Sequence, residues 1–529
     1  MACWSRLLRI AIVTVVSVAG SAAQQRIAPP IARERADMPE AMPTRPQVSS
    51  PSASAGLRGP GVTIVQANVN AAGQNIVGDA ANEPSLAVDP TNPNRLVIGW
   101  RQFNTISSNF RQAGFAYSSD AGRTWHFPGV ITPGTFRSDP VLGADLTGSF
   151  FYYTLRSVGS SFFCEMFKSA NGGQTWAGPV YAYGGDKAWM TIDQSPSIGR
   201  GNVYAHWTSV FSCCANTGFT RSINTAASFE TSIDLVGEPF YGTTTVGPNG
   251  ELYVLGASGA FNGLIVLRSD DAKNDAASVS FPQATLLPTL AVPDVGNSTS
   301  PNPAGLLGQG WIDVDRSGGP NNGNVYVVWS LVPESGIDPL DVFFFRSTDG
   351  GQTFSNPVLL NTDAGQGNWN WFATMSVAPN GRIDVAWNDT RGTAGLNFSR
   401  LYYRSSSDGG LTWSTEQVLT SAWNSFLGWP NQQKIGDYYQ MVSDNAGAGL
   451  AFSATFNGEQ DVYYARIGSF PCIGDLNNDR AVDESDLGIL LSHWQLAVPP
   501  HLNGDANGDA FVDSSDLGTL LSNWRVPCP

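Results

Sequence analysis

Short runs in which apolar and polar residues alternate recur from residue 61 to residue 470, and turns rich in Gly, Pro, Asn and Asp separate them. The run EPSLAVDPTNPNRLVIGWRQF, residues 83–103, contains two such strands joined by a turn, and GFAYSSDAGRTW, residues 114–125, adds a third. A period of two is typical of β-strands that bury one face. The pattern therefore predicts an all-β fold assembled from four-stranded units.

One eight-residue string returns where the third strand of each unit ends. The pattern is S-x-D/N-x-G-x-T-W/F, with clear copies that start at Ser118, Ser169, Ser347 and Ser406 and weaker copies that start at Ser222 and Ser269. In chain order the starts lie 51, 53, 47, 78 and 59 residues apart, about the length of one blade of a β-propeller, and the longest gap indicates a loop insertion. The repeats therefore predict a propeller of at least six blades.

A seventh unit, residues 437–468, has three strands and lacks the string. The early strand GVTIVQANV, residues 61–69, is the natural fourth strand for that unit. Its addition would close the ring and remove exposed strand edges, which otherwise pair with other chains. Seven blades are therefore favoured over six, and the propeller is expected to span residues 61–470.

The chemistry of the string is that of a turn. The Ser, Asp and Thr oxygens are suited to bond turn backbone, Gly tolerates positive φ, and the aromatic residue fills the space between sheets. The strings resemble the Asp box, or BNR repeat, of the sialidase-like propellers, in which the box lies far from the active site. That resemblance implies a fold that serves sialidases, other glycosidases and binding proteins without activity.

Candidate functional residues gather at the opposite end of the strands. In five units an acid stands near the start of the first strand: Glu83, Asp139, Asp186, Glu238 and Asp437. Basic residues follow the second strand in several units, namely Arg101, Arg156, His206 and Arg391. Each acid alone is more often a turn cap or a structural ion-pair partner, but together they predict a charged funnel. Four tryptophans near the same points either stack on sugars or pack between blades: Trp100, Trp207, Trp329 and Trp387.

The resemblance to sialidases implies specific roles for some of these residues. Arg101, Arg156 and Arg391 would grip a substrate carboxylate, Tyr438 or Tyr439 would be the nucleophile, Glu238 its partner and Asp139 the acid/base. From their place in the funnel, Glu83 and Asp437 are also expected to contact substrate. The sequence departs from sialidases because the Arg-Ile-Pro motif near the first arginine is absent. Three alternatives stay open: sialidase chemistry, another glycosidase activity, and glycan or protein binding by a surface or adhesion protein.

Residues 471–529 form a separate acidic segment with eight Asp and one Glu against two Arg. DLNNDRAVDESD and DANGDAFVDSSD each match a twelve-residue calcium loop at positions 1, 3, 5, 9 and 12, with a carbonyl at position 7. Each loop runs into a short apolar helix, LGILLSHW or LGTLLSNW. The sequence therefore predicts two Ca²⁺ sites, with ligands Asp475, Asn477, Asp479, Ala481, Asp483 and Asp486 in one and Asp505, Asn507, Asp509, Phe511, Asp513 and Asp516 in the other.

The paired loops and helices resemble a type I dockerin, which implies a cohesin-like protein as partner and contacts through Glu484, Ser485, Ser514 and Ser515. The segment departs from that family at the sixth loop position, where Arg480 and Ala510 replace glycine and would need positive φ. Cys472 and Cys528 bracket the segment and are expected to form a disulfide, whereas Cys164, Cys213 and Cys214 allow no assignment.

The N-terminus changes the expected location of the protein. Arg6 and Arg9 precede the apolar run IAIVTVVSVAG and the small residues 21–23, which is typical of a signal peptide over residues 1–23. Residues 24–60, rich in Pro, Ala, Ser and Arg, indicate a flexible segment. We therefore expect a secreted or cell-surface bacterial protein without a transmembrane anchor. The net charge of −15 argues against nucleic acid as a partner. The resemblance to the sialidase-like propellers implies a glycan or polysaccharide as the partner of the propeller.

Overall fold

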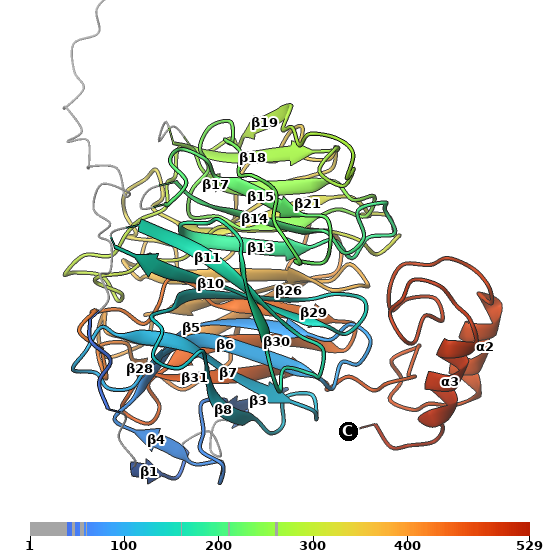
Figure 1. Cartoon of the computed structure of the whole chain (residues 1–529), viewed down its shortest axis with the longest axis horizontal. Coiled ribbons are helices and arrows are strands. Elements are labelled where there is room, and N and C mark those ends of the chain that lie inside the picture. The colour runs from blue at the N-terminus through green and yellow to red at the C-terminus, as the bar shows by residue number, and fades with distance from the viewer. Residues whose placement is uncertain are drawn as a thin grey trace, which may run out of the picture.

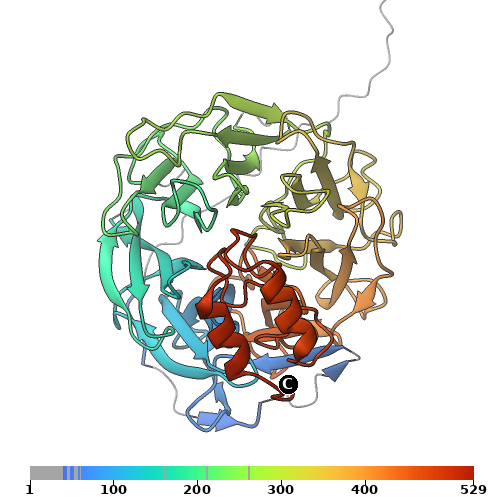
Figure 2. The same cartoon turned by 90° about the vertical axis from the view of Figure 1, so that its right-hand side faces the viewer.

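The computed structural model describes residues 40–44, 48–52, 58–59, 61–159, 161–209, 212–259 and 263–528. Seven antiparallel sheets stand in a ring, and the chain passes from one to the next around it (Figure 2). The prediction of a seven-bladed, all-β propeller is confirmed. The predicted signal peptide and most of the segment 24–60 lie outside the described residues.

The strands of each blade follow one another outward from the axis of the ring, which is why the repeats are regular in sequence. Blade 1 comprises β5 (Ala80–Val88), β6 (Leu96–Phe103), β7 (Arg111–Ser118) and β8 (His126–Ile131). Blade 2 comprises β9 (Ser138–Ala144), β10 (Phe150–Val158), β11 (Ser161–Ser169) and β12 (Ala177–Tyr181). Blade 3 comprises β13 (Asp186–Ile192), β14 (Val203–Thr208) and β15 (Phe219–Ser222).

The remaining blades repeat this order. Blade 4 comprises β16 (Thr244–Val246), β17 (Leu252–Ala257), β18 (Leu264–Ser269) and β19 (Gln283–Leu286). Blade 5 comprises β20 (Trp311–Val314), β21 (Val325–Leu331), β22 (Asp341–Ser347) and β23 (Val358–Leu359). Blade 6 comprises β24 (Asn370–Val377), β25 (Ile383–Asp389), β26 (Phe398–Ser406), β27 (Gln417–Val418) and β28 (Trp423–Asn424), which pairs with β26.

Blade 7 joins the two ends of the propeller sequence. Its inner strands are β29 (Gln440–Asp444), β30 (Gly447–Ala454) and β31 (Asp461–Gly468), and its outer strands are β3 (Val62–Gln66) and β2 (Arg58–Gly59). β3 pairs antiparallel with β31, with Val62 opposite Ile467. The early strand therefore closes the ring as predicted. A small two-stranded antiparallel sheet of β1 (Val48–Ser50) and β4 (Asn75–Val77) lies beside this closure.

The repeated strings are turns that are held by their own side chains. In blade 1 the Ser118 hydroxyl donates to Asp120 (2.7 Å) and accepts from the amide of Gly122 (2.9 Å). Asp120 also accepts from the amide (2.9 Å) and the hydroxyl (2.6 Å) of Thr124. The same bonds recur from Ser347 and from Ser406, and the weaker copies keep the central one. The strings are therefore architectural.

Large apolar side chains fill the space between neighbouring blades. The four tryptophans near the ends of second strands are all buried, with 0 to 1% of their surface exposed: Trp100, Trp207, Trp329 and Trp387. Burial of this much aromatic surface is a major source of stability for the ring. These tryptophans consequently belong to the core and offer no face to a sugar.

The C-terminal segment folds as a small module with two helices, α2 (Glu484–Ser492) and α3 (Ser514–Ser522). Asp483 and Asp513 cap the helices in identical capping boxes. Four buried residues form its core: Val482, Leu490, Val512 and Leu520. The module lies at one end of the propeller axis (Figure 1). Neither of these helices, the only ones in the described residues, is long and apolar enough to cross a membrane.

The cysteines pair in two ways. Cys472 and Cys528 form the disulfide that the sequence predicts, and it ties the two ends of the module together. Cys213 and Cys214, which are adjacent in the chain, form the second disulfide. The thiol of Cys164 is free and buried, and that burial raises its pKa. The structure thus makes the assignment that the sequence left open.

Candidate functional site

A charged cavity of about 440 Å³ opens at the end of the propeller opposite the repeated turns. The repeated turns lie at the same end as the turns between the first and second strands. In blade 1, Ala121 of the string donates its amide to the carbonyl of Asn94, which lies between β5 and β6. β9 begins at the cavity with Ser138 and runs away from it. Charged and amide residues that line the cavity are Asn109, Arg111, Asp139, Asp186, Lys187, Asn431, Gln432, Gln433, Lys434 and Asp437.

An irregular strand start carries several charged residues into this region. Glu83, Asp139 and Lys187 all have positive φ, of 59°, 48° and 52°, where the pairing of the first two strands shifts register. This region costs a residue with a side chain about 1–2 kcal/mol. Phe372 in blade 6 has the same conformation, with φ 58°. The bulge is therefore a property of the blade, and the charges at it are specific to blades 1 to 3.

The centre of the cluster is an ion-pair network between blades 3 and 7. The ammonium of Lys187 lies 3.1 Å from Asp186 and 3.1 Å from Asp437. Lys434 donates to the same oxygen of Asp437 at 2.6 Å, and the amide of Leu306 donates to its other oxygen at 2.8 Å. Asp437 thus connects the two lysines with the insertion between blades 4 and 5.

Blade 2 contributes Asp139 to the same network. Its carboxylate accepts from the amide of Lys187 at 3.2 Å and from the hydroxyl of Ser138 at 2.6 Å. Burial acts to raise the pKa of Asp139, but the charge of Lys187 and the Ser138 bond outweigh it and lower the pKa. Burial likewise opposes ionisation of Asp437, and the charges of Lys187 and Lys434 hold its pKa well below the usual value. Both carboxylates are therefore ionised at neutral pH.

Glu83 differs from its neighbours. Burial raises its pKa to about 8, and the Arg101 guanidinium, 3.1 Å away, offsets this only in part because the negative charges of Asp437 and Asp139 act in the opposite direction. With Glu83 neutral, the anions Asp139, Asp186 and Asp437 lie among the cations Arg101, Lys187 and Lys434, together with Arg111 of the cavity lining. Buried polar networks whose members satisfy one another are rigid and hold one arrangement of their side chains.

The tyrosines that the sialidase resemblance implicates lie in the core. Tyr438 is 1% exposed and donates its hydroxyl to the carbonyl of Pro140 at 2.7 Å. Tyr439 is also 1% exposed and donates to the carbonyl of Ser453 at 2.6 Å. Burial raises the pKa of both phenols above the usual value. Neither hydroxyl is placed to attack a ligand in the cavity.

The three arginines are held by separate acids. Arg101 is buried beside Glu83 and donates to Asn82 at 2.8 Å and to Gln432 at 3.0 Å. Arg156 pairs with Glu165 at 3.0 Å within blade 2. Arg391 pairs with Asp389 at 2.7 Å and with Glu416 at 2.9 Å in blade 6. Each guanidinium is engaged by its own blade or its neighbour, an arrangement typical of structural ion pairs.

Glu238 lies apart from the other acids of the predicted set. It is exposed, with φ 45°, in the loop that precedes β16. Among the described residues, Asp139, Asp186 and Asp437 line the cavity and Glu238 does not. The structure therefore brings three of the five predicted acids into the cavity, with Glu83 buried beside them.

Three parts of this site were missed in the sequence. Lys187 directly follows Asp186, and Lys434 stands three residues before Asp437, so both cations were visible beside predicted acids. The insertion between blades 4 and 5 lines the cavity with Val295, Gly296 and residues 303–306. Its only signal was the long spacing between two repeats. An insertion on one face of a repeat fold is a common place for a binding function.

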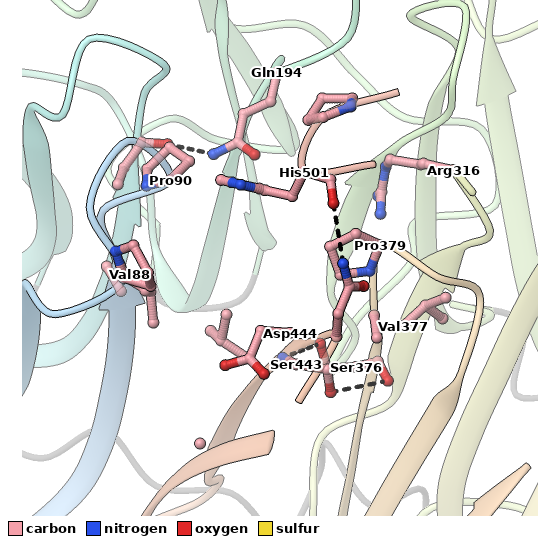
Figure 3. A pocket seen from close by; sticks show the side chains of 18 of the residues that line it. Val88, Pro90, Gln194, Arg316, Ser376, Val377, Pro379, Ser443, Asp444 and His501 are labelled. Carbon is pink, nitrogen blue, oxygen red and sulfur yellow. Dashed lines mark hydrogen bonds between the residues drawn. The ribbon is translucent and has the colours of Figure 1, made fainter. Parts of the chain in front are cut away.

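A second, larger cavity of about 590 Å³ lies at the other end, between the propeller and the module. Its lining includes the apolar side chains of Trp189, Trp311 and Met375. Figure 3 shows His501 of the module among propeller residues that include Pro90, Gln194 and Arg316. The carbonyl of His501 accepts from the amide side chain of Asn445 at 3.0 Å. The module thus lies against this cavity on the side of the repeated turns.

The two acidic loops of the module have matching internal bonds. Asp486 and Asp516, at the twelfth positions, are buried and accept from backbone amides at the start of their loops, at 2.7 Å from Leu476 and 2.9 Å from Ala506. Arg480 and Ala510 have φ of 72° and 70°, which confirms the positive φ predicted at the sixth position.

The acids of the second loop converge on one point. Oxygen atoms of Asp505, Asp509 and Asp516 all lie within 4.8 Å of one another. Asp505 and Asp516 are 1% and 0% exposed, so two buried carboxylates face each other there. Such a set suits a hard cation with several oxygen ligands, and the residues present therefore fit Ca²⁺.

No family model and no curated protein matches this chain. Similar solved structures are propellers of diverse kinds. A protein of unknown function from Dyadobacter fermentans DSM 18053 is 14% identical over 77% of this chain and 99% of its own, with a TM-score of 0.44. The hydrazine synthase of Kuenenia stuttgartiensis is 13% identical over 72% of this chain and 94% of its own, with a TM-score of 0.41. The intramolecular trans-sialidase of Ruminococcus gnavus, in complex with oseltamivir carboxylate, is 14% identical over 73% of this chain and 94% of its own, with a TM-score of 0.35. These likenesses concern the fold alone.

Proposed function

We propose that the propeller binds a glycan in the charged cavity and does not hydrolyse it. The observation that carries this proposal is the convergence of Asp139, Asp186, Lys187, Lys434 and Asp437, from three blades, on one cavity. Sugar hydroxyls both donate and accept hydrogen bonds, and this lining offers carboxylates, ammonium groups and amides together. Its volume falls in the range of about 300–1,000 Å³ that is usual for ligand sites.

The state of the acids favours binding over hydrolysis. A general acid must hold a proton at the working pH, but the pKa of Asp139 is lowered. Glu83, with a pKa of about 8, holds one, yet it is not among the residues that line the cavity. The tyrosines donate to backbone carbonyls within the core. The groups that glycosidic cleavage requires are therefore not gathered at the cavity.

A glycan array followed by calorimetry on the full chain tests the proposal. We expect the wild type to bind at least one class of glycan and to release no product from fluorogenic glycosides or from the bound glycan. Asp139→Asn should weaken binding, whereas Glu238→Gln, outside the cavity, should not. Turnover that Glu238→Gln abolishes would instead support a glycosidase, and the absence of any glycan ligand would contradict the proposal.

We further propose that each acidic loop of the module binds one Ca²⁺. Asp475, Asn477, Asp479, Asp483 and Asp486, with the carbonyl of Ala481, would hold one ion, and the corresponding residues of the second loop the other. Metal binding to such loops stabilises the fold around them. Calorimetry of the full chain should show two sites, of which Asp475→Ala removes one and Asp505→Ala the other. A wild type that binds no calcium would contradict this proposal.

We also propose that the protein is exported and attached through the module to a cohesin-like protein. The exposure of Glu484, Ser485, Ser514 and Ser515 supports this, because all four stand at helix starts on the module surface. N-terminal sequencing of protein from culture medium should find cleavage after residue 23. A panel of cohesin domains tests the partner, since replacement of these four residues should remove the binding. Retention of the uncleaved chain inside the cell would contradict export.

A further inference from the structure

A short segment before the first blade reaches the rim of the charged cavity. Residues 40–44 lie there, and Glu40 makes the closest contacts. Its Oε2 accepts from the amide of Asn109 at 2.7 Å and from the hydroxyl of Ser108 at 2.9 Å. The side-chain amide of Asn431 donates to its two oxygens at 3.4 and 3.5 Å. Asn109 and Asn431 are themselves lining residues of the cavity.

The segment is fixed at a second point. The side-chain amide of Asn104 donates to the carbonyl of Pro43 at 2.9 Å. Asn104 follows β6 of blade 1, so the segment crosses the same face of the propeller on which the cavity opens. The position of Glu40 is thus set by contacts with blade 1 and with the loop before β29.

The groups around the Glu40 carboxylate are donors. A backbone amide, a hydroxyl and a side-chain amide donate to it. An ionised carboxylate only accepts hydrogen bonds, so these three donors match it. The bond from Asn109 is the main reason that the pKa of Glu40 is lowered, and the positive charge of Arg111 acts in the same direction. Arg111 also lines the cavity and donates to Ser138 at 3.0 Å. The rim is therefore built to hold a negative oxygen pair.

We infer that Ser108, Asn109 and Asn431 form a carboxylate subsite at the cavity rim, which Glu40 of the same chain occupies and from which a uronic acid residue of an acidic glycan displaces it. This inference rests on the proposed glycan site and adds its ligand class. Glu40 is exposed, and hydrogen bonds of exposed groups contribute little net free energy, so a ligand carboxylate competes with it on similar terms. Glu40 then acts as a tethered competitor that lowers the apparent affinity.

Calorimetry with two matched probes tests the inference. Trigalacturonate carries the carboxylates and galactotriose, with the same linkage, lacks them. We expect Glu40→Ala to bind trigalacturonate roughly threefold to tenfold more tightly than the wild type, because the competitor is gone. Galactotriose should bind both proteins equally. Glu334→Ala is the control, since Glu334 is also exposed and accepts from a backbone amide, that of Leu290, at 2.8 Å.

Hydrogen exchange at the amide of Asn109 gives a second readout. Removal of Glu40 should speed exchange of this amide, and trigalacturonate should slow it again in Glu40→Ala. Adding Asn431→Ala to Glu40→Ala should cancel the gain in affinity. Equal affinity of wild type and Glu40→Ala for trigalacturonate would overturn the inference. If neutral glycans still bind in the cavity in that case, the proposed function stands; if no glycan binds any variant, both fail.

Discussion

The two ends of the propeller use polar residues in opposite ways. At the end with the repeated turns, each Asp bonds partners within the same few residues, as Asp120 does with Ser118 and Thr124. At the other end, Asp437 bonds Lys187 of blade 3 and the insertion between blades 4 and 5. Polar residues that repeat along a chain and satisfy themselves locally are architectural. Polar residues from different blades that satisfy one another mark a site.

The ends differ in burial as well. In the turns, Asp349 is exposed and Asp408 is half-buried, and six turns of this kind each contribute to stability. Asp437 and Glu83 of the charged end are both 0% exposed. Loss of a charge partner in a buried cluster leaves the remaining charges without compensation, whereas a solvated turn keeps water as a substitute. This contrast sets the expected size of each substitution below.

The largest effect is expected for Asp437→Asn. The change removes the anion shared by Lys187 and Lys434, and breaking a buried ion network costs about 3–5 kcal/mol. Chemical denaturation of the full chain should therefore show a much lower free energy of unfolding for the propeller transition. A variant within about 1 kcal/mol of the wild type would show that the cluster does not stabilise the ring.

The next effect concerns the module at the other end. Replacing both Cys472 and Cys528 by Ser opens a loop with a sequence separation of 56, and loops of that size correspond to about 2–4 kcal/mol. Calorimetric scanning should show the transition of the module at a lower temperature and that of the propeller unchanged. A simultaneous shift of both transitions would show that the two parts unfold as one unit.

A pH effect follows from Glu83. Its pKa is about 8 in the folded protein, above the unfolded value near 4.5. The free energy of unfolding that protonated Glu83 contributes is therefore fully present below the unfolded pKa and is lost as pH rises through 8. The slope is at most about 1.4 kcal/mol per pH unit. Stability of the wild type should decline from pH 5 to pH 8 relative to Glu83→Gln. Parallel pH profiles for the two proteins would contradict the buried, neutral Glu83.

The smallest effect is expected for a single repeated turn. Asp408→Ala removes bonds to Ser406 and Thr412 at a half-buried site, which should cost about 1 kcal/mol. The pKa of Asp408 is lowered to about 2 by the Thr412 hydroxyl and amide, so this contribution persists at neutral pH and is lost as pH falls from about 4 to 2. A loss as large as that of Asp437→Asn would erase the distinction between the two ends.

Most of the fold could be predicted because the propeller repeats itself. Every blade contains the same alternation, and even the weak copy at Ser222 keeps its bond to Asn224. The closing strand β3 was recognisable because the seventh unit lacked one strand. Repetition gives the same information several times, so one worn copy does little harm.

The site could be predicted only in part because only its acids follow the repeat. Asp139, Asp186 and Asp437 were found from their equivalent positions on three blades, and they do line the cavity. Tyr438, which the sialidase resemblance implicates, directly follows Asp437, but its ring packs against Trp189 in the core, at 5.3 Å between centroids. Lys434 and Glu40 lie outside the repeat, and their proximity depends on how distant segments meet. Such contacts leave no periodic signal.

The central claim is that the charged end binds the glycan and the turn end does not, and β9 offers both ends on one strand. Asp139 stands at its start in the cavity, and Asp145 follows its end in a turn, where it accepts from Thr147 and Ser149. The most direct test is calorimetric titration of the array-selected glycan into Asp139→Asn and Asp145→Asn. Gln433→Ala serves as an exposed lining variant, and circular dichroism checks that each variant folds. We predict that Asp139→Asn and Gln433→Ala bind at least tenfold more weakly than the wild type and that Asp145→Asn binds equally well. Loss of binding in Asp145→Asn with retention in the other two would contradict the account.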